Sequence, residues 1–175
     1  MVEVDDWSDI SLRPATPEDR FLIRRWLSDP QVQSWWGTAA SAEAEITLAL
    51  ASAAALPRII EGDGIPIGYA HAVEHGVWAT RLPEGVPAGA WEVDYFVTPA
   101  AHDATTGSVA LELLTGDVFA TTLAVACSGL VSIRNETAAR AYERAGFRWL
   151  QLLQDSLLGP SWLMLKERPG PPQAR

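Results

Sequence analysis

The architecture follows most directly from the stretch Asn135-Glu-Thr-Ala-Ala-Arg-Ala-Tyr-Glu-Arg-Ala-Gly-Phe147. Asn135 is a residue type that caps helix N-termini, and Gly146 can adopt the left-handed conformation that commonly ends a helix. The pattern therefore predicts a helix that begins at Glu136, carries an inward-facing Tyr142 and stops just before a new strand at Phe147.

Outward from this helix, hydrophobic periodicity, turn residues and prolines divide the rest of the chain into alternating helices and strands. The expected strands are residues 10–13, 58–61, 65–74 and 90–97, one within 123–133, and a final antiparallel pair at 147–154 and 157–166. The other expected helices are residues 16–27, 41–55, and one that follows Pro99 and ends near Gly116 or shortly after. The strand within 123–133 has no assigned register, and Gly129 could divide it.

Length and composition set limits on the class of protein. The 175 residues favour a single domain at 10–168 between loose segments at 1–9 and 169–175. With Cys127 as the single cysteine there is no internal disulfide, and no leader or membrane segment is predicted, so we expect a cytoplasmic protein. A net charge of −9 disfavours a nucleic-acid partner and suits a cationic small molecule, although it also serves simple solubility.

The pattern Asn-x-x-Ala-x-Arg-x-Tyr-Glu-x-Ala-Gly-Phe over residues 135–147 resembles the C-terminal signature of the GCN5-related N-acetyltransferases (GNAT). The resemblance implies an α/β (α+β) fold with a mixed, mostly antiparallel sheet of six to seven strands and about four flanking helices. It also implies acetyl-CoA as co-substrate, faced by Asn135 and Tyr142, and it allows a homodimer through edge strands.

Three further motifs are similar to the aminoglycoside 6'-N-acetyltransferase branch, and siderophore hydroxylysine acetyltransferases resemble them too. They are Leu12-Arg-Pro-Ala-x-x-x-Asp19, Trp26-Leu-x-x-Pro30-x-Val32-x-x-Trp35-Trp36-Gly37 and Pro66-Ile-Gly-Tyr69. By this resemblance Trp35 and Trp36 follow a short helix beside the acceptor site. Each tryptophan either stacks on the acceptor or packs in the core.

The turn His102-Asp-Ala-Thr105-Thr-Gly107-Ser108 stands where relatives carry a glycine-rich turn that cradles the CoA pyrophosphate. Phosphate binding requires close backbone approach at a helix N-terminus. The expected cofactor contacts here are Thr105, Thr106, Gly107 and Ser108. Because only Gly107 matches the glycines of the family and Asp103 adds negative charge, a catalytically silent GNAT-like binding module stays open as an alternative.

The candidate chemistry lies in Trp91-Glu-Val-Asp-Tyr-Phe-Val97, where Glu92 and Asp94 share one face of a strand. By resemblance Asp94 is the general base or ammonium anchor, Glu92 supports it, and both contact the acceptor. A bulge in this strand would free the backbone near Val97 to polarise the thioester, and Phe96 and Val97 would line the pantetheine arm. The alternative is a solvated or salt-bridged strand face.

The leading hypothesis is an N-acetyltransferase that acts on a primary amine of a small cationic molecule, such as an aminoglycoside, by direct attack on the thioester. Tyr142 would then protonate the departing thiolate, or it is simply packed. A siderophore precursor is the second choice of substrate. No metal site is predicted, because His71 and His75 lie four apart in a strand or its exit, a spacing that does not bring ligands together there.

Overall fold

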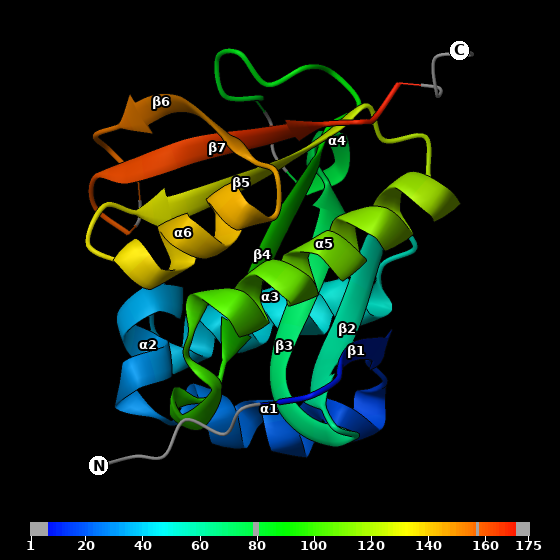
Figure 1. The fold of residues 1–175 in the computed structure, drawn as a ribbon, viewed down its shortest axis with the longest axis vertical. Helices are drawn as coiled ribbons and strands as arrows, with labels where there is room; N and C mark the ends of the chain where they lie inside the picture. The colour runs from blue at the N-terminus through cyan, green and yellow to red at the C-terminus, as the bar shows by residue number, and fades with distance from the viewer. Residues whose placement is uncertain (1–6, 79–80, 157, 171–175) are drawn as a thin grey trace.

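The computed structural model describes residues 7–78, 81–156 and 158–170, and in them one seven-stranded sheet lies between two layers of helices (Figure 1). The strands are β1 (Ile10–Pro14), β2 (Ala55–Gly62), β3 (Ile65–Glu74), β4 (Trp91–Val97), β5 (Ala126–Ser132), β6 (Arg148–Leu153) and β7 (Ser161–Glu167). The α-helices are α1 (Arg20–Leu27), α2 (Pro30–Trp36), α3 (Ala39–Ala51), α4 (His75–Trp78), α5 (Ala104–Thr121) and α6 (Glu136–Arg144), with single 3-10 turns at Pro17–Asp19 and Pro99–Ala101.

The strand order is β1-β2-β3-β4-β5-β7-β6, and every pair is antiparallel except β4 and β5. This mixed, mostly antiparallel sheet confirms the predicted fold class. Two of the helices, α2 and α4, are short, with seven and four residues. Among the described residues, no helix has both the length and the apolar character needed to span a bilayer.

The structure corrects one predicted boundary and decides two that the sequence left open, each through tertiary contacts. The helix expected at 41–55 ends at Ala51, since Ala55 already pairs with Val73 in the sheet. Helix α5 runs through Gly116 to Thr121, because Val118 is fully buried against the sheet and prolongs the packed face. Gly129 does not divide β5, which pairs with β7 along its whole length.

The Asp29-Pro30 pair ends α1 as predicted and also starts a new helix. The Asp29 carboxylate accepts a hydrogen bond from the Gln31 amide at 2.8 Å, so α2 begins at Pro30. Trp35 and Trp36 therefore form the last turn of a helix, whereas the sequence placed them after one.

At the two ends of the chain, residues 1–6 and 171–175, where most of the expected loose segments lie, are outside the described residues. Ser8 and Asp9 hydrogen-bond to the Asp63 carboxylate in the β2–β3 turn, at 2.7 and 2.9 Å. These contacts join the chain before β1 to the neighbouring hairpin.

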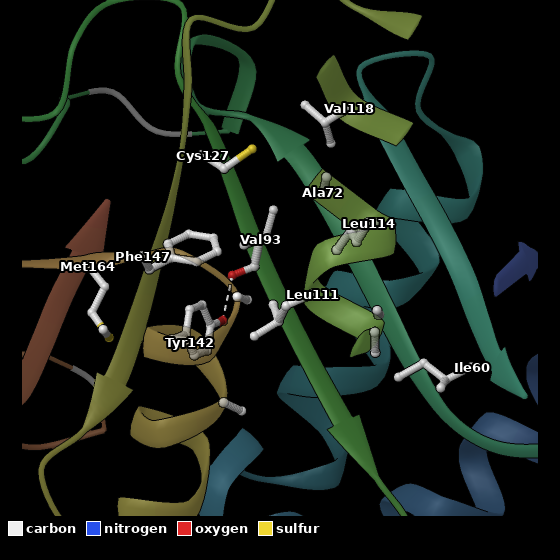
Figure 2. Close-up of a cluster of buried hydrophobic side chains, with 14 of the residues drawn as sticks. Ile60, Ala72, Val93, Leu111, Leu114, Val118, Cys127, Tyr142, Phe147 and Met164 are labelled. Carbon is white, nitrogen blue, oxygen red and sulfur yellow. Dashed lines mark hydrogen bonds between the residues drawn. The ribbon is translucent and has the colours of Figure 1, made fainter. Parts of the chain in front are cut away.

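The sheet separates two hydrophobic clusters. On one face, α5 and α6 cover Ile60, Ala72 and Val93 with leucine, valine and aromatic side chains (Figure 2). On the other face, α1, α2 and α3 cover Ile59, Tyr69 and Phe96. Strand alternation assigns adjacent residues such as Ile59 and Ile60 to opposite faces. Glu92 and Asp94 consequently lie on the α3 side of β4, beside Tyr69 and His71 of β3.

The parallel strands β4 and β5 pair only at Trp91 with Cys127 and at Glu92 with Ser128, and then separate. Tyr142 of α6 lies in the opening, where its hydroxyl donates a 3.0 Å hydrogen bond to the Val93 carbonyl (Figure 2). Its ring packs so closely on Gly129 that a Cβ atom there would overlap it. The gap is therefore held open by a buried side chain that also satisfies the backbone of β4.

We predict opposite stability effects for alanine at two glycines. Gly129→Ala should lower the free energy of unfolding by about 2 kcal/mol or more, because the methyl group must displace the buried Tyr142 ring. Gly116→Ala should raise it by up to about 1 kcal/mol, because Gly116 lies in α5 with open space around it and alanine favours helix. Urea unfolding measures both, and equal stabilities for the two variants would contradict the packing of Tyr142.

Candidate active site

The separation of β4 and β5 opens two adjoining hollows. The first, of about 440 Å³ including open solvent, lies between α2, the end of β4 and the start of α6. The second, of about 350 Å³, lies deeper along β4. Both are lined by Trp35, Tyr95, Asn135 and Ala138, so they form one continuous cleft.

Seven of the residues selected from the sequence line this cleft. The first hollow contains Phe96 and Val97, the second contains Trp36, Asp94 and Tyr142, and both contain Trp35 and Asn135. Asn135 also caps α6 as predicted, since its side-chain oxygen accepts from the Ala138 amide at 3.1 Å.

Asp94 is the carboxylate that lines the second hollow. Its Oδ1 accepts a 2.8 Å hydrogen bond from the Tyr95 amide. Burial, together with the negative charge of Glu45 on α3, raises the Asp94 pKa well above its usual range. A carboxylate with a raised pKa is a stronger base than an ordinary aspartate, and a cation beside it would be stabilised.

Glu45 and His71 are site residues that the sequence did not single out together. His71 is buried opposite Asp94, and its Nε2 lies 3.2 Å from the Glu45 carboxylate. Burial raises the Tyr69 pKa, so the phenol stays protonated, and its hydroxyl lies 3.2 Å from His71 Nδ1. Because a carboxylate only accepts hydrogen bonds, the His71 Nε2–H is directed at Glu45. The alternation of side chains along a strand predicts that His71 and Tyr69 share one face of β3. The contact of His71 with Glu45 on α3 could not be predicted, because it depends on tertiary packing.

The two tryptophans have different surroundings. Trp36 donates from its indole Nε1 to the Tyr95 carbonyl at 3.0 Å and packs edge-on against Tyr69 and Phe96. It forms a wall of the cleft and is fixed in the core. Trp35 borders both hollows, so its ring can meet a ligand in either one.

The register between β3 and β4 is unbroken from Gly68–Val97 to Glu74–Trp91, so β4 has no bulge on its β3 side. The β5-facing edge of β4 is instead exposed to the cleft by the departure of β5 after Glu92. The separation of β4 from β5 thus frees the β4 backbone near Val97, as a bulge would have done.

Tyr142 is 2% exposed, and burial raises its pKa well above its ordinary value. The phenol is consequently neutral and has a proton to donate, which it gives to Val93 in this structure. A role as proton donor to a ligand would require the hydroxyl to exchange this partner.

The N-terminus of α5 differs from the phosphate-binding turn that the sequence suggested. The Asp103 carboxylate accepts two 2.7 Å hydrogen bonds, from the Thr106 amide and the Thr106 hydroxyl. Thr106, Gly107 and Ser108 are buried, and a Cβ atom at Gly107 would overlap the Tyr95 hydroxyl. The glycine is thus needed for packing between α5 and β4. Thr105 is the exposed member of this set, and it accepts from Arg144 at 3.0 Å.

The predicted supporting residue Glu92 borders a different hollow, next to His75 and Ser128. Burial and the charge of Glu45 raise its pKa. Within residues 7–78, 81–156 and 158–170, no three His, Cys, Asp or Glu side chains are arranged to hold a metal ion. Cys127 is fully buried, and burial raises its pKa to about 12, so it is unreactive packing.

The chain belongs to the GNAT family of acetyltransferases, because the family model described as an Acetyltransferase (GNAT) domain matches residues 16–154. No curated protein matches the chain in sequence.

Solved structures support the fold. The aminoglycoside acetyltransferase AAC(6')-Ib, in complex with coenzyme A and kanamycin, has a TM-score of 0.76 at 24% identity and covers 91% of this chain and 95% of its own. The spermidine N-acetyltransferase from Vibrio cholerae, in complex with CoA and spermine, has a TM-score of 0.72 at 15% identity and covers 91% and 96%. The aminoglycoside N(6')-acetyltransferase from Legionella pneumophila has a TM-score of 0.70 at 17% identity and covers 90% and 91%.

We predict that Asp94→Asn stabilises the protein at alkaline pH. The folded-state pKa of Asp94 is raised, so protonation of this carboxyl group favours the folded state. Its contribution to the free energy of unfolding is most favourable below the unfolded-state pKa of about 3.9, and it is lost as pH rises through the folded-state pKa. Asparagine cannot ionise and retains an oxygen for the Tyr95 amide. The melting temperature of the Asp94→Asn variant should exceed that of the wild type at pH 8, and the difference between the two should vanish near pH 4.

The matched control is Glu136→Gln, which removes a carboxylate that is 83% exposed. Its melting temperature should follow the wild type at both pH values. A similar shift in both variants would show that the effect is one of net charge and not of Asp94 burial.

Proposed function

We propose that this protein transfers the acetyl group of acetyl-CoA to a primary amine of a small cationic molecule of the aminoglycoside type. The observation that carries the proposal is Asp94, a carboxylate whose pKa is raised by burial and that lines a cleft between separated strands. Membership of the GNAT family supports the acetyl transfer. The neighbours in complex with kanamycin or spermine support the class of acceptor.

Acetyl-CoA would supply the activated acetyl thioester. The first hollow has the apolar and amide lining that suits a pantetheine arm, with Phe96, Val97 and Ala138 at its walls and Asn135 at its end. The backbone of β4 beyond Glu92, freed by the departure of β5, is available to donate to a developing oxyanion.

In the transfer, the amine nitrogen forms a bond to the acetyl carbon and the carbon–sulfur bond breaks. An Asp94 carboxylate oxygen accepts a proton from the incoming ammonium group, directly or through water. Tyr142 is neutral and buried at the same cleft, so its hydroxyl can give a proton to the leaving sulfur. The second proton lost by the attacking nitrogen then passes through water to the Tyr142 phenolate, and the restored hydroxyl donates to Val93 again.

The charges around Asp94 favour a cationic acceptor. Glu45 and Glu92 are each about half-exposed, and the ion pairs formed by the described residues give them only histidine partners. Three carboxylates without lysine or arginine attract ammonium groups and repel phosphates and carboxylates. A polyamine or an aminosugar fits this surface.

A second candidate is a GNAT-like binding module that does not transfer acetyl groups. The observation that favours it is Asp103, whose carboxylate already uses the amide and hydroxyl of Thr106 at the helix end where pyrophosphate would bind. The lining of the first hollow thus favours the acetyltransferase, whereas Asp103 at the α5 terminus favours the binding module. A measurement of acetyl-CoA binding distinguishes the two functions.

We predict that Asp94→Asn lowers kcat for acetylation of kanamycin at least 100-fold, because general base catalysis contributes roughly two to four orders of magnitude. Release of free CoA thiol measures the rate, and Glu167→Gln, which removes an exposed carboxylate on β7, is the charge-matched control. An Asp94→Asn variant with wild-type kcat would remove Asp94 from the mechanism. Wild-type protein that binds acetyl-CoA and acetylates neither kanamycin nor spermine would limit the proposal to other acceptors.

We also predict that Asp103→Asn tightens acetyl-CoA binding by about fivefold or more in titration calorimetry. Asparagine keeps the helix cap, so the change removes one negative charge near the pyrophosphate, worth about 1 kcal/mol at short range in water. Glu167→Gln, a remote and exposed carboxylate on β7, should not alter the affinity. Failure of both wild type and Asp103→Asn to bind millimolar acetyl-CoA would favour the non-catalytic module.

A further inference from the structure

A third hollow, of about 270 Å³ including open solvent, lies next to Leu130, beside β4 and β5. It is lined by His75, Pro83, Glu92, Ser128, Gly129, Leu130, Leu153 and Leu163, and we call it the His75 hollow. Leu130 borders both this hollow and the one that contains Asp94. The two hollows therefore adjoin at the Leu130 side chain.

The polar side of this hollow is built from a buried histidine and its partners. His75 is 4% exposed, and its Nε2 lies 2.7 Å from the Ser128 hydroxyl and 3.8 Å from the Glu92 carboxylate. Its Nδ1 is buried and has no hydrogen-bond partner among the described residues. A polar atom left in this state is rare, because its desolvation is uncompensated.

His75 is neutral at physiological pH, because burial lowers its pKa. One ring nitrogen therefore carries a lone pair, and the Ser128 oxygen and the Glu92 carboxylate also accept hydrogen bonds. The hollow presents acceptors and a negative charge, which are the groups that an ammonium ion requires. Its leucines and proline offer contact to a carbon chain or to the apolar face of a sugar ring.

The distance between Glu92 and Asp94 along β4 sets how far the His75 hollow lies from the proposed site of acetyl transfer. Glu92 and Asp94 are two residues apart on the same face of β4, which corresponds to about 7 Å along the strand. Glu92 is 44% exposed and lines the His75 hollow, so its carboxylate is accessible to a ligand there. One molecule with two amines at this separation can reach both carboxylates.

We propose that the His75 hollow is a second acceptor subsite, in which Glu92, His75 and Ser128 bind a second ammonium group of the molecule acetylated at Asp94. The inference rests on the proposed function and makes it narrower, because the acceptor is then a diamine or polyamine. Glu92 becomes a specificity determinant, and His75 and Ser128 become residues that position its carboxylate.

The test compares n-pentylamine with cadaverine, which differ by one terminal amine, as ligands of the CoA-saturated protein in titration calorimetry at neutral pH. We expect cadaverine to bind at least tenfold more tightly than pentylamine. Glu92→Gln should abolish this ratio, and His75→Asn and Ser128→Ala should each reduce it severalfold. Glu74→Gln, which removes a charge from the neighbouring position on β3, should leave the ratio unchanged.

Imidazole NMR of the wild type provides a readout that does not depend on the folding of a variant. The chain has three histidines, and a His102→Gln variant assists their assignment. Cadaverine should shift the His75 ring nitrogens, and pentylamine should not.

The possible results separate the subsite from the reaction. Equal affinities for the two amines, or a cadaverine preference that survives in Glu92→Gln, would overturn the subsite even if acetylation proceeds. Cadaverine binding that depends on Glu92 and shifts His75, without acetylation of any amine, would uphold the subsite and reject the proposed reaction.

Discussion

The structure depends on the wedge that Tyr142 forms between β4 and β5. Two parallel strands that pair at only two positions leave polar backbone groups in the interior, and unpaired buried groups are costly. The Tyr142 hydroxyl satisfies the Val93 carbonyl, and its ring fits only because Gly129 has no side chain. This single packing arrangement lets the sheet open without losing stability, and the opening is the cleft.

The chemistry of the cleft follows from the same opening. Strand alternation puts Glu92 and Asp94 on the α3 face, where the departure of β5 leaves room for a ligand. Burial and Glu45 raise the pKa of Asp94, so a group that would ordinarily be a weak base becomes a stronger one at the cost of stability. The α5 terminus has the opposite character, because Asp103 places a carboxylate where an anion would otherwise bind.

The sequence predicted the elements well where local signals were strong. Asn135 caps α6, and the turn before Ile65 forms the expected hairpin of β2 and β3. Local patterns placed the end of α5 only near Gly116 or shortly after, because the packing of buried Val118, with which the helix continues to Thr121, is a tertiary contact. They also could not reveal the short helix that carries Trp36.

For the site, the sequence identified the residues on β4 and α6 because they belong to continuous motifs. It missed Glu45 as the partner of His71, since that pair joins α3 to β3 through tertiary packing. It assigned Gly107 to phosphate binding, which stays a prediction, and it did not foresee that the missing side chain leaves room for Tyr95. Spacing along a chain gives the face of a strand, but which helix lies above that face depends on the packed core.

The most direct test of this account is hydrogen exchange of the backbone amides with and without acetyl-CoA, since the central claim is that the opening between β4 and β5 receives the thioester. The account predicts slower exchange in residues 94–97 of β4 and 135–138 of α6, with no change in β1 and β2. Unchanged exchange at 94–97 under saturating acetyl-CoA, or protection confined to another part of the sheet, would contradict it.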